Sequence, residues 1–213
     1  MRYAVYYTPA PGSALARFGS AWFARSAPCL DTPRRYGFHG TLKAPFRLAA
    51  GVDETGLLLA VERFAAERPA LSGPPLGIAV LADFLALVPS ARFGELDRLA
   101  ADCVAAFDRF RAPPGAAELA RRRRAGLNPR EEALLRRWGY PYVMDAFRFH
   151  LTLTGRLDEA GLASERAEAK ALLGEAALPL FVDAVTVAVE PAEGAAFRLL
   201  QRFEFGKPGG SRA

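Results

Sequence analysis

Apolar and polar residues alternate strictly in two short segments of the chain. In residues 36–43 the polar positions of the alternation are His39, Thr41 and Lys43. In residues 147–154 they are Arg148, His150, Thr152 and Thr154. Successive side chains on a β-strand point to opposite faces of the sheet. Each segment is therefore predicted to form a half-buried strand with an apolar back and a polar front.

Hydrophobic periodicity and turn residues predict the other elements. Apolar residues at helical spacing indicate helices over residues 13–22, 53–68, 93–110, 116–124, 130–138 and 158–173. Further strands are predicted over residues 2–8, 76–81, 84–88, 181–190 and 196–205, with a hairpin turning near Asp83. The order of elements is similar in the two halves of the chain. It predicts an α+β fold of two antiparallel sheets with flanking helices, bilobal and pseudo-twofold, enclosing a central groove.

This arrangement is expected to be a single domain of two lobes over residues 1–205. The Ala-Pro-Pro-Gly sequence that ends the 93–110 helix predicts a crossover between the lobes near residues 111–128. The end of the chain, residues 206–213, is rich in glycine and is predicted to be a disordered tail.

The composition is that of an ordinary globular protein, since 51% of the 213 residues are hydrophobic and 24% are charged. No apolar run reaches the length of ~18–20 residues that a membrane helix needs. A strand pattern occupies the place of a signal peptide, and Cys29 and Cys103 make no disulfide framework. We expect a cytoplasmic protein without a membrane partner. The sequence leaves the oligomeric state open, with a monomer as the expectation.

A formal net charge of +5 suggests an anionic ligand. The run of arginines at residues 121–124 is the most basic patch, and its favoured interpretation is a solvated helix face. No segment matches an aromatic and basic RNA-binding module. A small phosphorylated molecule is therefore favoured over RNA as the partner.

The two histidines of the chain occupy the same position in a repeated pattern of aromatic, any residue, Phe, His, any residue, Thr, Leu. Imidazole can accept or donate a proton near neutral pH. His39 and His150 on opposite walls of a groove would suit a reaction that removes one proton and delivers another, such as hydrolysis of a phosphodiester. Thr41 and Thr152 face the same way as the histidines and can donate hydrogen bonds to phosphate oxygens as negative charge develops there.

Other residues on or near these faces are candidates for substrate binding. Lys43 and Arg148 could neutralise the charge of the phosphate, and Tyr6 is expected on the wall of the groove. Two histidines without a nearby cysteine or a recurring carboxylate fall short of the usual ligand count of a metal site. No metal and no cofactor are therefore expected.

The segments His39-Gly40-Thr41-Leu42 and His150-Leu151-Thr152-Leu153 resemble the paired His-x-Thr-hydrophobic signatures of the 2H phosphoesterase superfamily. Residues 2–7, 35–46 and 140–150 are more similar still to a bacterial branch encoded beside genes for phosphonate utilisation. The resemblance thus extends over nearly the whole chain.

This resemblance implies a bilobal, pseudo-twofold fold and metal-independent hydrolysis of a cyclic phosphodiester. It also implies that His39, Thr41, His150 and Thr152 are the catalytic residues. By analogy with plant members of the superfamily, His150 would be the base and His39 the acid. The phosphonate context points to a ribose cyclic phosphate or a related intermediate as the substrate.

Two other functions remain open at this point. One is a non-catalytic binder of a phosphorylated or phosphonate ligand. The other is an RNA-end enzyme that resembles the 2′,3′-cyclic phosphodiesterases or 2′-5′ ligases of the superfamily. The complete pair of histidines and threonines favours a small-molecule phosphoesterase over the binder, because a binder has no use for two proton carriers.

Overall fold

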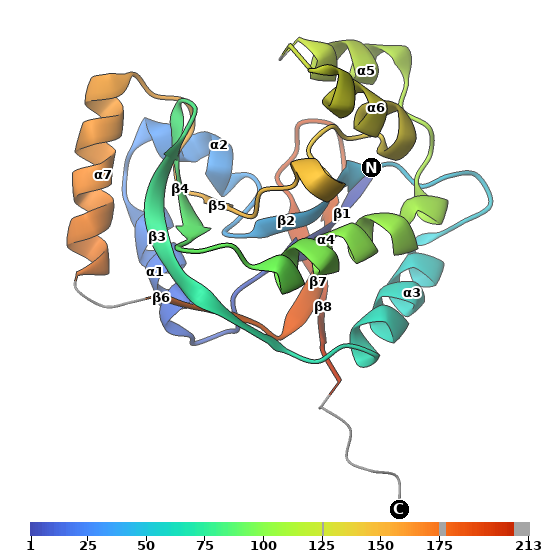
Figure 1. Ribbon diagram of the computed structural model, residues 1–213, viewed down its shortest axis with the longest axis horizontal. Coiled ribbons are helices and arrows are strands. Elements are labelled where there is room, and N and C mark those ends of the chain that lie inside the picture. The colour runs from blue at the N-terminus through green and yellow to red at the C-terminus, as the bar shows by residue number, and fades with distance from the viewer. Residues whose placement is uncertain (125, 175–177, 207–213) are drawn as a thin grey trace, which may run out of the picture.

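The computed structural model describes residues 1–124, 126–174 and 178–206 (Figure 1). Its framework is one eight-stranded sheet in the order β6-β3-β4-β5-β2-β1-β7-β8, with every neighbouring pair antiparallel. The strands are β1 (Arg2–Tyr7), β2 (Gly40–Phe46), β3 (Leu71–Leu81), β4 (Phe84–Pro89), β5 (Leu151–Thr152), β6 (Leu178–Val182), β7 (Ala184–Glu190) and β8 (Arg198–Glu204). The predicted α+β class is confirmed. The predicted tail, apart from Gly206, lies outside the described residues.

The sequence predicts two sheets, whereas the structure has one sheet, which can be divided into two halves. Each half has four strands, and the pairing of β5 with β2 that joins them consists of a single residue pair, Gly40 and Leu151. β6 and β7 are separated only by Asp183. One nearly continuous extended segment therefore contributes a strand to each half of the sheet. Because β6 pairs with β3 and β7 pairs with β1, the sheet curves strongly between its halves (Figure 1).

These halves do not correspond to the first and second parts of the sequence. β3 and β4 lie with β5 and β6, whereas β7 and β8 return to β1 and β2. The chain therefore changes halves between β2 and β3 and again at Asp183. Of residues 111–128, where the sequence predicts a crossover, residues 116–123 form the helix α5 (Ala116–Arg123). A proline-glycine break ends a helix, but it carries no information about which strands pair.

The two histidine segments form shorter strands than predicted. β2 begins at Gly40 and β5 comprises only two residues, so each histidine lies directly before its strand. Gly37, at a φ of 74°, turns the chain ahead of His39, and a 3-10 turn at Met144–Ala146 precedes His150. Each histidine is thus held at the boundary between a turn and the sheet.

The predicted hairpin of β3 and β4 is confirmed, with Leu81 paired to Phe84. β3 begins at Leu71, earlier than the predicted start at residue 76, and it runs through the two prolines at 74–75. Its pairing with β6 has a register shift at this place. The shift accommodates the prolines, which cannot donate ladder hydrogen bonds.

Helices cover the sheet, and most begin where the sequence predicts. They are α1 (Ala14–Ala24), α2 (Asp31–Arg34), α3 (Glu54–Ala66), α4 (Gly94–Ala106), α5, α6 (Pro129–Trp138) and α7 (Glu159–Leu173). The side chains of Ser13, Asp53 and Asp158 accept hydrogen bonds from backbone N–H groups in the first turns of α1, α3 and α7. α4 ends earlier than predicted, and a 3-10 turn follows it. Within the described residues, no helix combines the length and apolarity needed to cross a membrane.

The main apolar core packs against one face of the sheet, and the opposite face can carry a functional site. Val5 belongs to this core, whereas the next residue, Tyr6, belongs to a small cluster on the opposite side. The indole N–H of buried Trp22 on α1 donates to the carbonyl oxygen of Leu153 at 2.8 Å. This bond ties α1 to the second histidine segment from the core side.

Candidate active site

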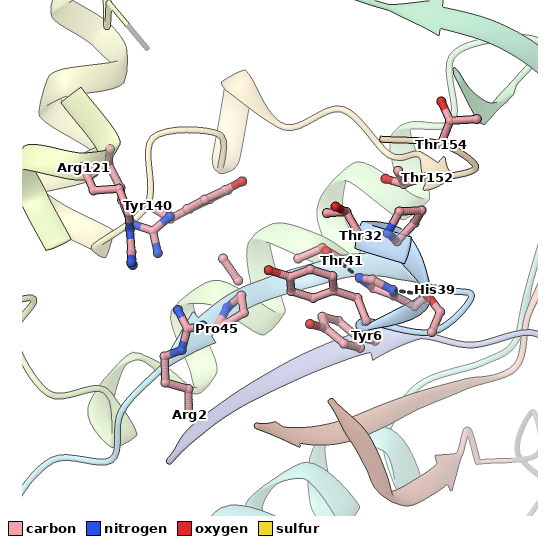
Figure 2. Close-up of a pocket in the computed structure, with 15 residues that line it drawn as sticks. Arg2, Tyr6, Thr32, His39, Thr41, Pro45, Arg121, Tyr140, Thr152 and Thr154 are labelled. Carbon is pink, nitrogen blue, oxygen red and sulfur yellow. Dashed lines mark hydrogen bonds between the residues drawn. The ribbon is translucent and has the colours of Figure 1, made fainter. Parts of the chain in front are cut away.

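A cavity of about 490 Å³ lies beside the join between the halves of the sheet, on the side that carries Tyr6. Its lining combines residues of both histidine segments with residues of the surrounding turns and helices (Figure 2). They are Arg2, Tyr6, Thr32, Pro33, Tyr36, Gly37, His39, Thr41, Ala44, Pro45, Arg121, Arg122, Tyr140, Thr152 and Thr154. The volume is within the range usual for small-molecule sites.

The two motifs meet in antiparallel register at the join. Gly40 pairs with Leu151. Continued by one residue in each direction, this register sets His39 opposite Thr152 and Thr41 opposite His150. Each histidine therefore lies across from the threonine of the other motif. The two histidines are diagonal neighbours, a relation that separates positions by about 7–8 Å in an antiparallel pair.

Each imidazole makes the same kind of hydrogen bond, from its Nδ1 to a backbone carbonyl oxygen two residues earlier in the chain. Nδ1 of His39 lies 2.9 Å from the carbonyl oxygen of Gly37, and Nδ1 of His150 lies 2.8 Å from that of Arg148. A carbonyl oxygen can only accept, so each Nδ1 carries the proton of the bond. In the neutral ring, Nε2 is then left with its lone pair. Both rings can accept a proton at Nε2 or, once protonated, donate one from it.

The surroundings of His39 favour the neutral imidazole. Its ring lies against Tyr6, with 3.8 Å between the ring centroids. Burial lowers the pKa of His39 to about 4; the hydrogen bond to the Gly37 carbonyl opposes this shift, and the charge of His150 adds to it. The hydroxyl oxygen of Thr41 lies 3.2 Å from Nε2. Because that nitrogen is unprotonated at neutral pH, the Thr41 hydroxyl is the donor of this bond.

The second motif is arranged less symmetrically than its sequence suggests. His150 packs against Phe84 of β4, with 5.8 Å between the ring centroids, and it does not line the cavity. Thr152 and Thr154 line it instead. The hydroxyl of buried Thr154 accepts the N–H of Leu85 at 3.0 Å, so it serves the strand pairing.

A glycine between His39 and Thr41 allows the two motifs to pack closely. Gly40 faces the ring of Phe149, the residue before His150. A Cβ atom built at Gly40 would meet two carbons of that ring at 2.4 Å and 2.7 Å, closer than carbon atoms can approach. The ring of Phe149, which is buried, therefore occupies the space that a side chain at position 40 would need.

The predicted position of Lys43 on the polar face with His39 is wrong. Tyr6 pairs with Thr41, but Val5 pairs with Lys43, so β2 contains one extra residue between these pairs. Such a bulge changes the face to which the following side chains point. Lys43 is buried in consequence, and its ammonium group donates to the carbonyl oxygen of Val104 at 3.1 Å.

The buried ammonium of Lys43 is only partly compensated. Desolvation lowers the pKa of Lys43 to about 8, although Asp108, whose carboxylate lies 3.8 Å away, opposes the shift. Lys43 therefore acts behind the sheet, against α4, and it is no longer a candidate contact for a substrate.

Arg148 and Tyr6 were predicted on or near the wall of the groove. Tyr6 lines the cavity, and burial raises the pKa of its hydroxyl far above the ordinary value, so the phenol stays neutral. Arg148 is exposed and does not line the cavity. Its defined contribution to the site is the backbone carbonyl that holds His150.

Comparison with known proteins places the chain in a family. A family model described as "Protein of unknown function (DUF1045)" matches residues 41–198. The chain belongs to the DUF1045 family.

Two curated relatives of this DUF1045 chain carry the same name, ribose 1,5-bisphosphate phosphokinase PhnN. The protein of Janthinobacterium sp. (strain Marseille) is 42% identical over 234 residues, which cover 98% of this chain and 51% of that protein. The protein of Laribacter hongkongensis (strain HLHK9) is 41% identical over 216 residues, which cover 93% of this chain and 50% of that protein. The DUF1045 chain thus spans about half the length of the curated relatives that it matches.

Two solved structures align with nearly the whole DUF1045 chain at low sequence identity. The crystal structure of TT0787 of Thermus thermophilus covers 98% of this chain and 100% of its own, with a TM-score of 0.51 and 13% identity. The crystal structure of E. coli LigT complexed with 3′-AMP covers 97% of this chain and 98% of its own, with a TM-score of 0.49 and 15% identity. The first alignment shows that the overall fold is shared with a solved structure.

The sequence alone does not identify the arginines and tyrosines of the DUF1045 cavity. It favours a solvated helix face for the run 121–124, whereas Arg121 and Arg122 line the cavity. Successive residues of a helix point about 100° apart, because 3.6 residues make one turn. Four consecutive arginines therefore cannot all face solvent on one side, and this is the signal that could have indicated an inward-facing member. Tyr36 is the first residue of the segment 36–43 and is not one of its polar positions, and Tyr140 lies outside both alternating segments, so neither carries such a signal.

The groups that converge on this site are proton carriers and donors for anions. Among the residues that the structure describes, no group of three or more His, Cys, Asp or Glu side chains is placed to hold a metal ion. The imidazole of His39, the hydroxyls of Thr41 and Thr152 and three guanidinium groups surround the cavity. Such a set is suited to binding a phosphate group and to moving protons at its oxygen atoms.

Proposed function

We propose that the protein is a phosphoesterase of the 2H type that hydrolyses a cyclic phosphodiester without a metal ion. The observation that carries the proposal is the matched pair of Nδ1 hydrogen bonds, which leaves Nε2 of both His39 and His150 available for proton transfer. The antiparallel register of the two motifs adds Thr152 as a donor for the oxygens of the phosphate, and Thr41 as a second donor once its hydroxyl turns from Nε2 of His39 to the substrate.

The proposed reaction needs one proton acceptor and one proton donor. A water molecule forms a bond to phosphorus while its proton passes to Nε2 of the first histidine. The bond from phosphorus to one bridging oxygen breaks, and this oxygen takes a proton from Nε2 of the second histidine. The products are a phosphomonoester and a free hydroxyl group. Exchange with solvent then returns both imidazoles to their starting protonation states.

We assign His39 as the base and His150 as the acid. The lowered pKa of His39 keeps its Nε2 unprotonated at neutral pH, as an acceptor must be. This order is the reverse of the one implied by analogy with plant members of the superfamily. A bound phosphate anion raises the pKa of an adjacent imidazole, which makes His39 a stronger acceptor once the substrate is present.

The names of the curated relatives support a phosphorylated ribose as the substrate class. Both relatives are named for a kinase that acts on ribose 1,5-bisphosphate, and this chain spans about half of each. The sequence contains no G-x-x-x-x-G-K-[ST] phosphate-binding loop, and its paired histidines suit hydrolysis rather than transfer of a phosphoryl group from a nucleotide. We propose a ribose cyclic phosphate as the substrate and do not carry over the kinase activity.

The proposal is tested by following a panel of cyclic phosphates with phosphorus-31 NMR, in the presence of a chelator. The panel holds ribose 1,2-cyclic phosphates, nucleoside 2′,3′-cyclic phosphates and short RNA with a cyclic end. Turnover should fall by about 10²–10⁴ in each of His39→Ala and His150→Ala, with unchanged thermal unfolding. Tight binding of one compound without turnover would support a binding protein instead. Preferred turnover of the RNA would support an RNA-end enzyme.

A further inference from the structure

One end of the cavity is strongly basic. Its charged side chains are Arg2, Arg121 and Arg122, and no carboxylate is among the lining residues. Arg121 and Tyr140 lie at one side of the close-up view, whereas His39, Thr152 and Thr154 lie at the other (Figure 2). Arg121, whose neighbour on α5 is Arg122, thus lies away from His39, and Arg2 at the start of β1 lies on the same side of the view as Arg121.

The orientation of Arg122 is set by its neighbours and leaves one donor unused. Nη2 of Arg122 donates to Glu118 at 2.9 Å, and its guanidinium carbon lies 4.7 Å from the centre of the Tyr140 ring. Nε of Arg122 is buried and has no hydrogen-bond partner among the described residues. Buried polar groups nearly always have a partner, so the unused donor indicates a missing acceptor beside Arg122, one of the residues that line the cavity.

Among the described residues, the other two arginines of the cavity also have N–H donors without a partner. Nε of Arg2 donates to the buried carboxylate of Glu190. This bond does not use the two Nη nitrogens of the guanidinium. Arg121 is half exposed, and within the part of the chain that the structure describes its one ion pair, with Glu193, is long at 3.8 Å. A guanidinium fixed at one edge presents its other N–H groups in a planar fork, which matches the oxygens of a phosphate.

We propose that this end of the cavity binds a second phosphoryl group of the same substrate, in the form of a phosphomonoester. The inference rests on the proposed function, because it takes the cyclic phosphate to lie at the histidines. The substrate would then be a sugar that carries a cyclic phosphodiester at one end and a phosphomonoester at the other. Its hydrolysis would yield a sugar bisphosphate.

The experiment compares ribose 1,2-cyclic phosphate with its 5-phosphorylated form. The ratio of the two kcat/KM values should favour the 5-phosphorylated form in the wild type. It should fall by about 10- to 100-fold in Arg121→Gln and Arg122→Gln, which is the effect of losing a hydrogen bond to a charged group. Arg124→Gln is the matched control, because Arg124 lies at the end of the same helix, is exposed and does not line the cavity.

The possible failures are distinguishable. Equal kcat/KM values for the two forms, with a ratio that no arginine variant changes, would overturn the second subsite but leave the phosphoesterase standing. Hydrolysis of neither form would overturn the proposed function. In that case the subsite is tested by measuring the binding of ribose 5-phosphate by calorimetry. If the subsite exists, ribose 5-phosphate should bind, His39→Ala should retain this binding, and Arg122→Gln should weaken it. Absence of such binding, or a preference for cyclic-ended RNA over the phosphorylated sugar, would overturn the subsite as well.

Discussion

Replacing Gly40 with alanine tests whether the close packing of the two motifs is required for activity. The new Cβ would lie 2.4 Å from a carbon of the Phe149 ring, whereas ordinary contacts begin near 3.4 Å. The ring or the strand must therefore move by 1.0 Å, the difference of these two distances. Phe149 is buried with only 7% of its surface exposed, so little free space is available for this movement.

Two magnitudes follow from the displacement. Overpacking of a buried site costs about 1–3 kcal/mol in the free energy of unfolding. Phe149 precedes His150 in the chain, so a shift of the ring also moves an imidazole relative to His39. A misplacement of about 1 Å costs on the order of 10² in rate. We expect Gly40→Ala to lose more activity than its loss of stability explains.

The assay measures kcat/KM on the best cyclic phosphate together with denaturant unfolding. Gly77→Ala is the matched control, because Gly77 also lies in a strand but a Cβ atom there meets nothing within 4 Å. Adding Phe149→Leu to Gly40→Ala makes room for the methyl group and should restore part of the activity, so that the two substitutions are not additive. If Gly40→Ala changed kcat/KM by less than about twofold, as a neutral surface substitution does, the packing argument would be refuted.

Two further predictions concern titrating groups. The acid limb of the kcat/KM profile should lie near pH 4, because the base must be unprotonated and burial lowers the pKa of His39 to about 4; an acid limb near the ordinary histidine value of about 6.5 would contradict His39 as the base. Lys43→Met should leave kcat/KM unchanged, since Lys43 lies behind the sheet. The pKa of Lys43 is about 8 in the folded protein and 10.5 in the unfolded chain. Between these pH values the unfolded state binds more protons, so the free energy of unfolding increases with pH. The wild type should therefore gain about 3 kcal/mol of stability relative to the variant as the pH rises through this window. A parallel pH dependence of unfolding in the two proteins would show that Lys43 is not desolvated.

Local signals in the sequence predicted most of the helices and strands well. Ser13, Asp53 and Asp158 cap helices as predicted, because capping depends only on residues within one turn. The alternation that places His39 and Thr41 together is likewise a local property. Strand pairing is not local, and the sequence therefore predicts two separate sheets where the structure has one.

Lys43 shows where the alternation stops being informative. The extra residue in β2 is defined only by the pairing with β1, where Val5 and Tyr6 are consecutive but their partners are not. Nothing within residues 36–43 reports this shift. The arginines of the cavity are a second example, since Arg121 and Arg122 reach the site from α5, far from either motif in the sequence. The helical spacing of the arginine run indicates an inward-facing member, but the site that this member reaches depends on how the helix packs.

The order in which the strands are placed along the chain bears on how the molecule folds. The half of the sheet with β3, β4, β5 and β6 comes from one continuous stretch, residues 71–182, and contains a tight hairpin. The other half pairs Ala4 with Ala188, residues from opposite ends of the described chain. Contacts so distant in sequence are expected to form late, because closing a long loop costs conformational entropy before the contacts within it contribute any stabilising free energy. The half of the sheet that follows His39 is therefore expected to be completed after the other half, once β7 is available to pair with β1.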